Sequence, residues 1–381
     1  VMSVVENPNR KGMLFAGTGH AFYYSTDDGG HWTHEQTGLP AAPVSWIVVP
    51  KLWHDVVVST YGRGLFIMHD ITTLEQSDKI PANAEAYFYE PRPAFRQARS
   101  GSADFRFMVK EAPRDSVELQ IADASGTTVR TIKQTARSGE NAITWNLEYD
   151  GPDQVELRTT PDDNPHIWDE LRFKGKDTRP VTHWGIEGPE RAGPMAVPGH
   201  YTAKLIIGGT TYTRPFEILV DPAIATSQAD LEASLATQVQ MRGDMNETVK
   251  MINRLEVMRK TLEDQEKVST NDPAHAQELR ALNDKFLNVE TQLISEENLN
   301  SDDKYFVTAD KVYLNLIWLY AEVGGGGGDV AGGSDHKPTD TSMEVLRMIE
   351  KDLGSAKLAY DALMKNDLAT YNRLTGAKII P

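Results

Sequence analysis

The sequence predicts a mainly β protein with an α-helical carboxyl-terminal part. Short runs rich in β-branched and aromatic residues, separated by Gly, Pro and Asp turns, fill the chain up to residue 222. From residue 223 onward the apolar residues instead recur every three or four positions, which is the helical period. The 381 residues, 40% of them hydrophobic, are enough for two or three globular units.

Residues 1–80 contain an internal repeat of strands. In each copy a strand that ends in Thr, Thr18 or Thr60, leads through Gly to a second apolar strand. The separation of the two Thr residues is close to the roughly 40–45 residues of one β-propeller blade. We expect about one complete blade and part of another. Because such repeats bury their faces only against neighbours, we expect the remaining blades to come from upstream residues or a second chain.

The turn from Ser25 to Trp32 matches the S/T-x-D-x-G-x-x-W hairpin known as the Asp-box, which is typical of propeller blades. Asp27 is expected to accept backbone N–H groups, and Gly29 to supply an unusual backbone conformation. Trp32 is expected to cover the hairpin from its apolar side, and Ser25 opens the motif. The motif also occurs in sialidases, usually away from the catalytic centre. It therefore indicates a fold and not a reaction.

A Pro-punctuated linker, residues 81–104, precedes a predicted sandwich of the immunoglobulin type at 105–222. Its strands are expected at 105–109, 117–121, 128–132, 142–147, 198–205 and 212–218. The segments VELQIADASGTTVRTI, GENAITWNLEYDG and PGHYTAKL resemble the Ig-like domain of the flagellar hook-capping family. This chain departs from that pattern by a long insertion, residues 152–194.

The insertion is rich in His, carboxylates and Trp: Asp162, Asp163, His166, Trp168, Asp169, His183 and Trp184. Their spacing matches no defined metal site, so no bound metal is predicted. We expect instead a folded loop that uses its two Trp residues as anchors against the sandwich.

Residues 223–381 are predicted to form an up-down bundle of about four helices. Their apolar faces begin at Leu231, Leu279, Tyr305 and Leu346, and a short final helix is expected near 368–374. Thr341 with Glu344 forms a candidate capping box for the fourth helix. The Gly-rich loop at 324–338 lacks the Gly-Lys-Ser/Thr of a phosphate loop and is interpreted as a flexible connection between helices.

Composition excludes several functional classes. The chain has no Cys, which removes disulfides and thiolate metal sites. A net charge of −16 argues against a nucleic-acid partner, and no apolar run is long enough to span a bilayer. No cofactor is predicted. The lack of Cys is consistent with a periplasmic or secreted bacterial protein, whose signal peptide would lie outside this chain.

The order of Asp-box blades, Ig-like sandwich and helices resembles the carboxyl-terminal part of large exported bacterial proteins with sortilin-type propellers, often labelled glycosyl hydrolase or BNR-repeat proteins. The segments YGRGLFIMHDI, LVDP and LATYNRLTGAKIIP also carry this resemblance. We favour a non-catalytic binding or assembly component, in which the propeller presents a surface for a protein or glycan ligand and the sandwich and bundle act as a docking platform.

The alternative is a sialidase-like glycoside hydrolase whose catalytic residues lie mainly in missing upstream blades. A hydrolase needs two carboxyl groups about 5 to 10 Å apart, and this sequence identifies no such pair. Asp55, Asp70 and Arg63 are interpreted as turn or rim residues, and the catalytic residues remain unknown. Whether the complete protein is an enzyme is therefore left open.

Overall fold

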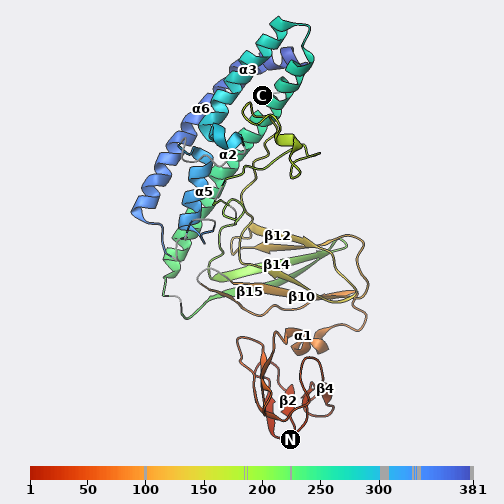
Figure 1. Cartoon of the computed structure of the whole chain (residues 1–381). Helices are drawn as coiled ribbons and strands as arrows, with labels where there is room; N and C mark the ends of the chain where they lie inside the picture. Colours follow the sequence, from red (N-terminus) through yellow and green to blue (C-terminus); the bar gives the residue numbers. More distant parts are fainter. Residues whose placement is uncertain are drawn as a thin grey trace. The chain divides into compact units, whose positions relative to one another are not determined.

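The computed structural model shows a mixed β plus α protein that forms two compact units (Figure 1). It describes residues 1–97, 101–183, 185–186, 188–223, 225–300, 309–327, 330, 332 and 336–377. The first unit comprises Val1–Leu147 and Val197–Ile224, and the second comprises Glu148–Ala196 and Ala225–Pro381. The predicted β plus α class is confirmed.

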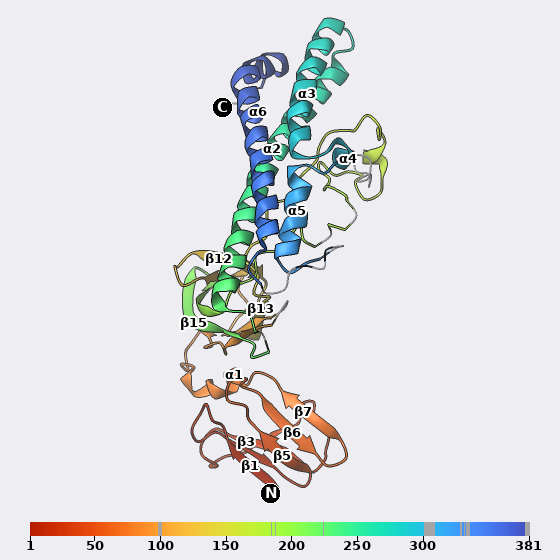
Figure 2. The ribbon, with the colours of Figure 1, turned by 90° about the vertical axis from the view of Figure 1, so that its left-hand side faces the viewer.

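The amino-terminal part of the first unit contains two antiparallel sheets. One has four strands in chain order: β1 (Ser3–Glu6), β2 (Leu14–Gly17), β3 (Phe22–Ser25) and β4 (Thr33–Glu35). The other has three strands in chain order: β5 (Val44–Val48), β6 (Val56–Thr60) and β7 (Gly64–Met68). Figure 2 shows these two sheets side by side.

The two sheets share one apolar core. Phe15 and Phe22 stack with their ring centroids 5.9 Å apart, and Val44, Ile47 and Val58 contribute from the second sheet. All five side chains are buried. The alternation of side chains along each strand directs these residues to the face between the sheets.

Gly17, at the end of β2, lies directly against Val44 of β5. A Cβ atom at this position would lie 2.5 Å from Val44 Cγ1 and 2.7 Å from the Val44 carbonyl oxygen. We expect Gly17→Ala to lower the free energy of unfolding by about 1–3 kcal/mol, because the sheets must separate to admit the methyl group. Gly19→Ala is the matched control, since no atom lies within 4 Å of its Cβ. Equal unfolding midpoints in urea for both variants would contradict this expectation.

The segment that we expected to be a linker contains regular structure. A short helix, α1 (Thr72–Glu75), and a 3-10 turn (Ser77–Lys79) precede it, and residues 81–104 themselves include strands β8 (Ala86–Phe88) and β9 (Ala94–Arg96). β8 pairs with β10, and β9 pairs in parallel with β15, so both strands extend the sandwich. Their length of three residues explains why the alternating pattern was too short to read.

The sandwich contains one three-stranded and one five-stranded sheet, in the orders β13-β10-β8 and β12-β11-β14-β15-β9. The long strands are β10 (Ala103–Val109), β11 (Val117–Ala122), β12 (Thr128–Gln134), β13 (Gly139–Trp145), β14 (Gly199–Ile207) and β15 (Thr210–Val220). Aromatic residues join the sheets: Trp145 meets Tyr201 and Phe216 edge-on, and Phe105 meets Phe216 at 5.0 Å.

The helices of the second unit are α2 (Gln228–Val268), α3 (Pro273–Leu293), α4 (Glu296–Leu299), α5 (Val312–Val323) and α6 (Asp340–Thr375). Four of these helices, α2, α3, α5 and α6, surround a common core. Leu255, Phe286, Leu316 and Leu346 are examples of the side chains that meet in the core. Among the described residues, no helix has the length and apolar character needed to cross a bilayer.

Two details of the helices differ from the sequence predictions, and a third lies outside the described residues. The cap of α6 is Thr339, whose side chain accepts the N–H of Ser342, and not Thr341. The ring of Pro338 disfavours a helical conformation at Lys337, so the helix begins after Pro338, and Thr339 is the first capping residue that follows it. Residues 368–374 belong to α6 and form no separate helix, since no Gly or Pro interrupts them. The expected start of the third helix at Tyr305 lies outside the described residues, and α5 begins at Val312.

The insertion forms part of the helical unit. Residues 153–160, here called the strap, lie along the side of α2. The side chains of Val155 and Leu157 enter the helical core. Asn246 and Asn253 on α2 accept the backbone N–H groups of Asp153 and Glu156, at 2.7 and 2.8 Å. The insertion thus uses polar anchors on α2, where we had expected two Trp anchors on the sandwich. Trp168 is partly buried, and Trp184 lies outside the described residues.

Candidate functional site

The Asp-box residues come together in the turn between β3 and β4. The Ser25 hydroxyl donates to Asp27 Oδ1 at 2.8 Å and accepts the N–H of Gly29 at 3.0 Å. Asp27 Oδ1 also accepts the N–H of His31 at 2.8 Å. Gly29 has φ +87°, a conformation that L side chains rarely adopt. The turn is therefore closed by its own side chains.

Hydrogen bonding in this turn changes the acidity of Asp27. The backbone N–H of His31, then its ring and the Ser25 hydroxyl, hold the pKa of Asp27 well below its ordinary value. Trp32 lies beside Gly29 but is 42% exposed, so its cover of the hairpin is partial. All the polar partners of Asp27 are residues of the turn, as a structural hairpin requires.

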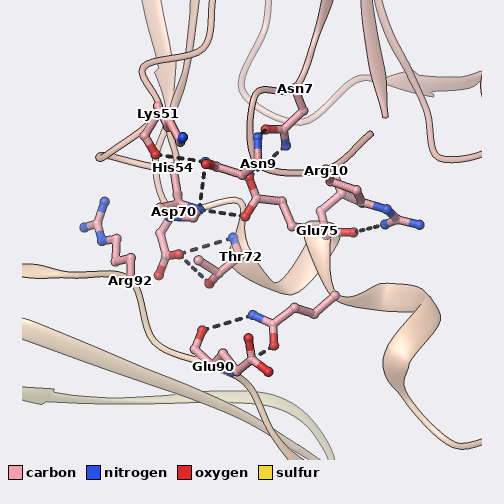
Figure 3. A network of polar contacts seen from close by, with 12 residues as sticks. Asn7, Asn9, Arg10, Lys51, His54, Asp70, Thr72, Glu75, Glu90 and Arg92 are labelled. Carbon is pink, nitrogen blue, oxygen red and sulfur yellow. Dashed lines mark hydrogen bonds and ion pairs between the residues drawn. The ribbon is translucent and has the colours of Figure 1, made fainter. Parts of the chain in front are cut away.

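A larger polar network surrounds Glu75 on α1 (Figure 3). Asn7 Nδ2 donates to Glu75 Oε1 at 2.7 Å, and His54 Nδ1 lies 2.6 Å from Glu75 Oε2. Asn9 Nδ2 donates to the carbonyl of Lys51 at 2.9 Å. These contacts join the β1–β2 loop, the β5–β6 loop and α1, across sequence separations of 21 to 68 residues.

A cavity of about 230 Å³ opens beside this network. Its charged lining residues are neutralised in pairs: Arg10 with Asp78 at 3.2 Å, and Lys79 with Glu90 at 3.6 Å. His54 also lines it and is held by Glu75. No Ser or Cys nucleophile stands among its lining residues. The arrangement is suited to fastening loops together and shows no catalytic constellation.

Asp55 and Asp70, considered above as turn or rim residues, both have structural partners. Asp55 accepts the N–H of Asp70 at 2.8 Å and lies 3.2 Å from Arg92. Asp70 accepts from the Thr72 hydroxyl at 2.6 Å and from Arg106 Nε at 2.5 Å. Burial raises the pKa of Asp70, but the bonds from Thr72 and Arg106 outweigh it and keep the pKa below its ordinary value. Arg63 is exposed in the β6–β7 turn.

The polar residues of the insertion do not converge on one point. His166 and Asp169 are exposed and 3.4 Å apart, whereas His183 is buried and faces the Trp318 ring. Asp162 and Asp163 line a different hollow beside α2 and α3. Within the part of the chain that the structure describes, no three His, Asp or Glu side chains are placed to hold a metal ion.

The described part of the Gly-rich loop closes a helix. Gly324 ends α5 and donates its N–H to the carbonyl of Tyr320 at 2.9 Å. Gly326 and Gly327 have φ of +80° and +127°, which explains the use of Gly there. Gly328 and Gly333 lie outside the described residues.

The outward face of the β5–β6–β7 sheet is apolar and uncovered within the described residues. The strand register places Trp46, Val48, Val57, Leu65 and Ile67 on this face. Trp46 is 66% and Leu65 73% exposed. The opposite face of the same sheet is equally apolar and is covered by the β1–β4 sheet. Apolar residues on both faces are typical of a sheet that packs on both sides.

Sequence reasoning missed a buried ionic cluster in the helical unit. Glu256 and Glu290 are fully buried, and Arg259 lies between them. Arg259 Nη1 is 2.5 Å from Glu290 Oε2 and 3.3 Å from Glu256 Oε1. A usable signal was present, because Glu256, Arg259 and Glu263 interrupt the apolar stripe of α2 at helical spacing.

In comparisons with known proteins, no family model and no curated protein matches this chain.

Proposed function

We propose that this chain is a non-catalytic binding or assembly component of a larger exported propeller protein. The β1–β4 and β5–β7 sheets act as neighbouring blades, and the sandwich and helices serve as a docking platform. The observation that carries the proposal is the outward apolar face of β5–β7. Its occupant is a further blade, an antiparallel sheet with an apolar face.

The packing of the covered face supports a blade as the occupant. On that side, Val44, Ile47 and Val58 meet Phe15 and Phe22 of a second antiparallel sheet. The outward face offers the same kind of side chains at the same strand register. A sheet that repeats this packing on both sides is the unit of a stacked repeat.

The chemistry of the face favours a protein occupant over a sugar. Trp46 alone resembles an aromatic sugar platform, but Val48, Leu65 and Ile67 surround it and Ser59 is the polar side chain among them. Sugar hydroxyls need several hydrogen-bonding partners, because a polar group buried without one costs about 1–3 kcal/mol. An aliphatic surface gains instead by packing on another aliphatic surface.

The two Thr residues of the repeat give independent support. The Thr18 hydroxyl donates to the carbonyl of Ala21 at 3.0 Å, and the Thr60 hydroxyl donates to the carbonyl of Gly64 at 2.7 Å. Each Thr therefore closes the turn that follows its strand. Equivalent residues with equivalent roles are expected if both sheets descend from one repeated unit.

The absence of Cys from the chain allows a direct test by thiol labelling. Leu65→Cys would place one thiol on the outward face, and Leu171→Cys, at a residue 94% exposed, is the control. We expect both variants of the 381-residue chain to react quickly. When the source itself produces the protein with each substitution, the Leu65→Cys thiol should react at least tenfold more slowly than the Leu171→Cys thiol. Equal rates in the native protein would refute the blade contact, and release of sugar from a glycan would refute the non-catalytic role.

A further inference from the structure

The backbone of the strap is held by two kinds of side chain along α2. Its first part, at Asp153 and Glu156, is bound by the amide groups of Asn246 and Asn253. Its last part, Arg158 to Thr160, is bound by carboxylates instead. Amide groups do not titrate, whereas carboxylates do. The two parts of the strap therefore differ in their sensitivity to protons.

Glu256 is the main anchor of the last part. Its Oε2 accepts the backbone N–H of Arg158 and, at 2.9 Å, that of Thr159. Its Oε1 accepts the Thr159 hydroxyl at 2.8 Å. Glu263 Oε1 accepts the N–H of Thr160 at 2.9 Å. Three of these four bonds end on one carboxylate that is fully buried.

Glu256 shares its cation with a second buried carboxylate. Arg259 Nη1 contacts both Glu256 and Glu290, and Arg259 Nε donates to Asn283 at 3.1 Å. The two buried carboxylates therefore share one nitrogen atom of the same guanidinium, and a buried charge without a close partner is costly. Burial, followed by the charge of Glu256, raises the pKa of Glu290 to about 8, against the opposing effect of Arg259.

Other charged groups also lie near the cluster. From α2, Glu263 adds a further carboxylate, with Lys260 and Lys267 at 3.9 and 3.7 Å from it. From the insertion, the buried Arg179 interacts favourably with both Glu256 and Glu290. On the α6 side of α3, Asp367 is paired with Lys285 at 2.6 Å.

We propose that Glu256, Arg259 and Glu290 form a proton-controlled latch, which holds residues 158–160 on α2 while Glu290 is protonated and loosens them when Glu290 ionises. Ionised Glu290 competes with Glu256 for Arg259, and water can relieve that competition if the strap lifts. Lifting residues 158–160 costs less free energy than separating α2 from α3, because the two helices are joined by apolar packing.

The direction of the pH effect follows from linkage. The folded pKa of Glu290 lies above that of a hydrated Glu, so the closed latch binds more protons than the open one between these two values. Closing is therefore most favourable at pH below about 4.5 and weakens as the pH rises toward 8. Above that pH the effect levels off.

Amide hydrogen exchange of the 381-residue chain tests the latch, with rates corrected for intrinsic chemistry at pH 5.5 to 9. We expect the open population at Arg158, Thr159 and Thr160 to rise by up to about tenfold per pH unit below pH 8. Asp153 and Glu156, held by Asn side chains, serve as an internal control and should change little. Parallel slopes at both ends of the strap would overturn the proposal, and this comparison needs no variant.

Three variants sharpen the test. Glu290→Gln keeps an acceptor for Arg259 and should abolish the slope at residues 158–160. Thr159→Val removes one bond to Glu256 and should raise the open population while preserving the slope. Glu278→Gln changes an exposed carboxylate on the same helix as Glu290 and should behave as wild type. A slope that persists in Glu290→Gln would assign the titration to another group and reject the latch.

Discussion

Replacing Glu256 by Ala is expected to lower the free energy of unfolding of the helical unit by about 3–5 kcal/mol. The substitution leaves the buried guanidinium of Arg259 with one carboxylate fewer. It also leaves the backbone N–H groups of Arg158 and Thr159 without their acceptor. Removing one member of a buried charged network is costly, since the remaining members keep their desolvation cost.

The loss should appear as a lower urea midpoint of the helical signal in circular dichroism. Glu247→Ala is the matched control, because Glu247 lies on the same helix and contacts Lys357 at the surface. An exposed pair of this kind contributes about 0–1 kcal/mol. Equal shifts of the urea midpoint in both variants would mean that Glu256 contributes no more to stability than an exposed carboxylate does.

The parts of the fold that could be predicted from sequence are those coded by a local period. Alternation predicted β11, and the three-to-four spacing predicted α2, α3 and α6, because burial of one face imposes these periods directly. The start of α6 was placed two residues late because Thr339 and Thr341 are both competent caps. The choice between them depends on backbone geometry after Pro338, which composition does not encode.

The partner of the insertion could not be predicted. Residues 152–194 interrupt the sandwich in sequence, and this position favoured the sandwich as their support. Their hydrogen bonds go to side chains on α2 that are more than 90 residues away, such as Asn253 and Glu256. Sequence patterns carry no information on contacts of that range.

The candidate sites divide in the same way. The Asp-box could be predicted from the sequence because Ser25, Asp27 and Gly29 form hydrogen bonds within four residues of one another. The cluster of Glu256 and Glu290 could not be predicted, because these carboxylates lie on different helices and come together only when the helices pack. A Glu in the apolar stripe of a helix indicates a buried ionic group, but it does not identify the residue that pairs with it.

Replacing Trp145 by Ala is expected to lower the free energy of unfolding of the sandwich by about 3–5 kcal/mol. Trp145 is fully buried at the end of β13 and contacts Tyr201 and Phe216 on the opposite sheet, at 5.9 and 6.2 Å between ring centroids. The truncation removes the largest buried side chain between the two sheets. Tyr201 and Phe216 are already packed 5.8 Å apart, so they have little freedom to move into the space.

Hydrogen exchange of β10 and β13 in increasing urea should report this loss at the site. Trp46→Ala provides a matched control in the same unit, because Trp46 is 66% exposed in the 381-residue chain and its removal should change stability by about 0.5 kcal/mol or less. The same control bears on the proposed function, since a blade covering Trp46 in the native protein would make that substitution costly there. A small effect of Trp145→Ala would mean that the sheets are held by their edges and not by the aromatic core.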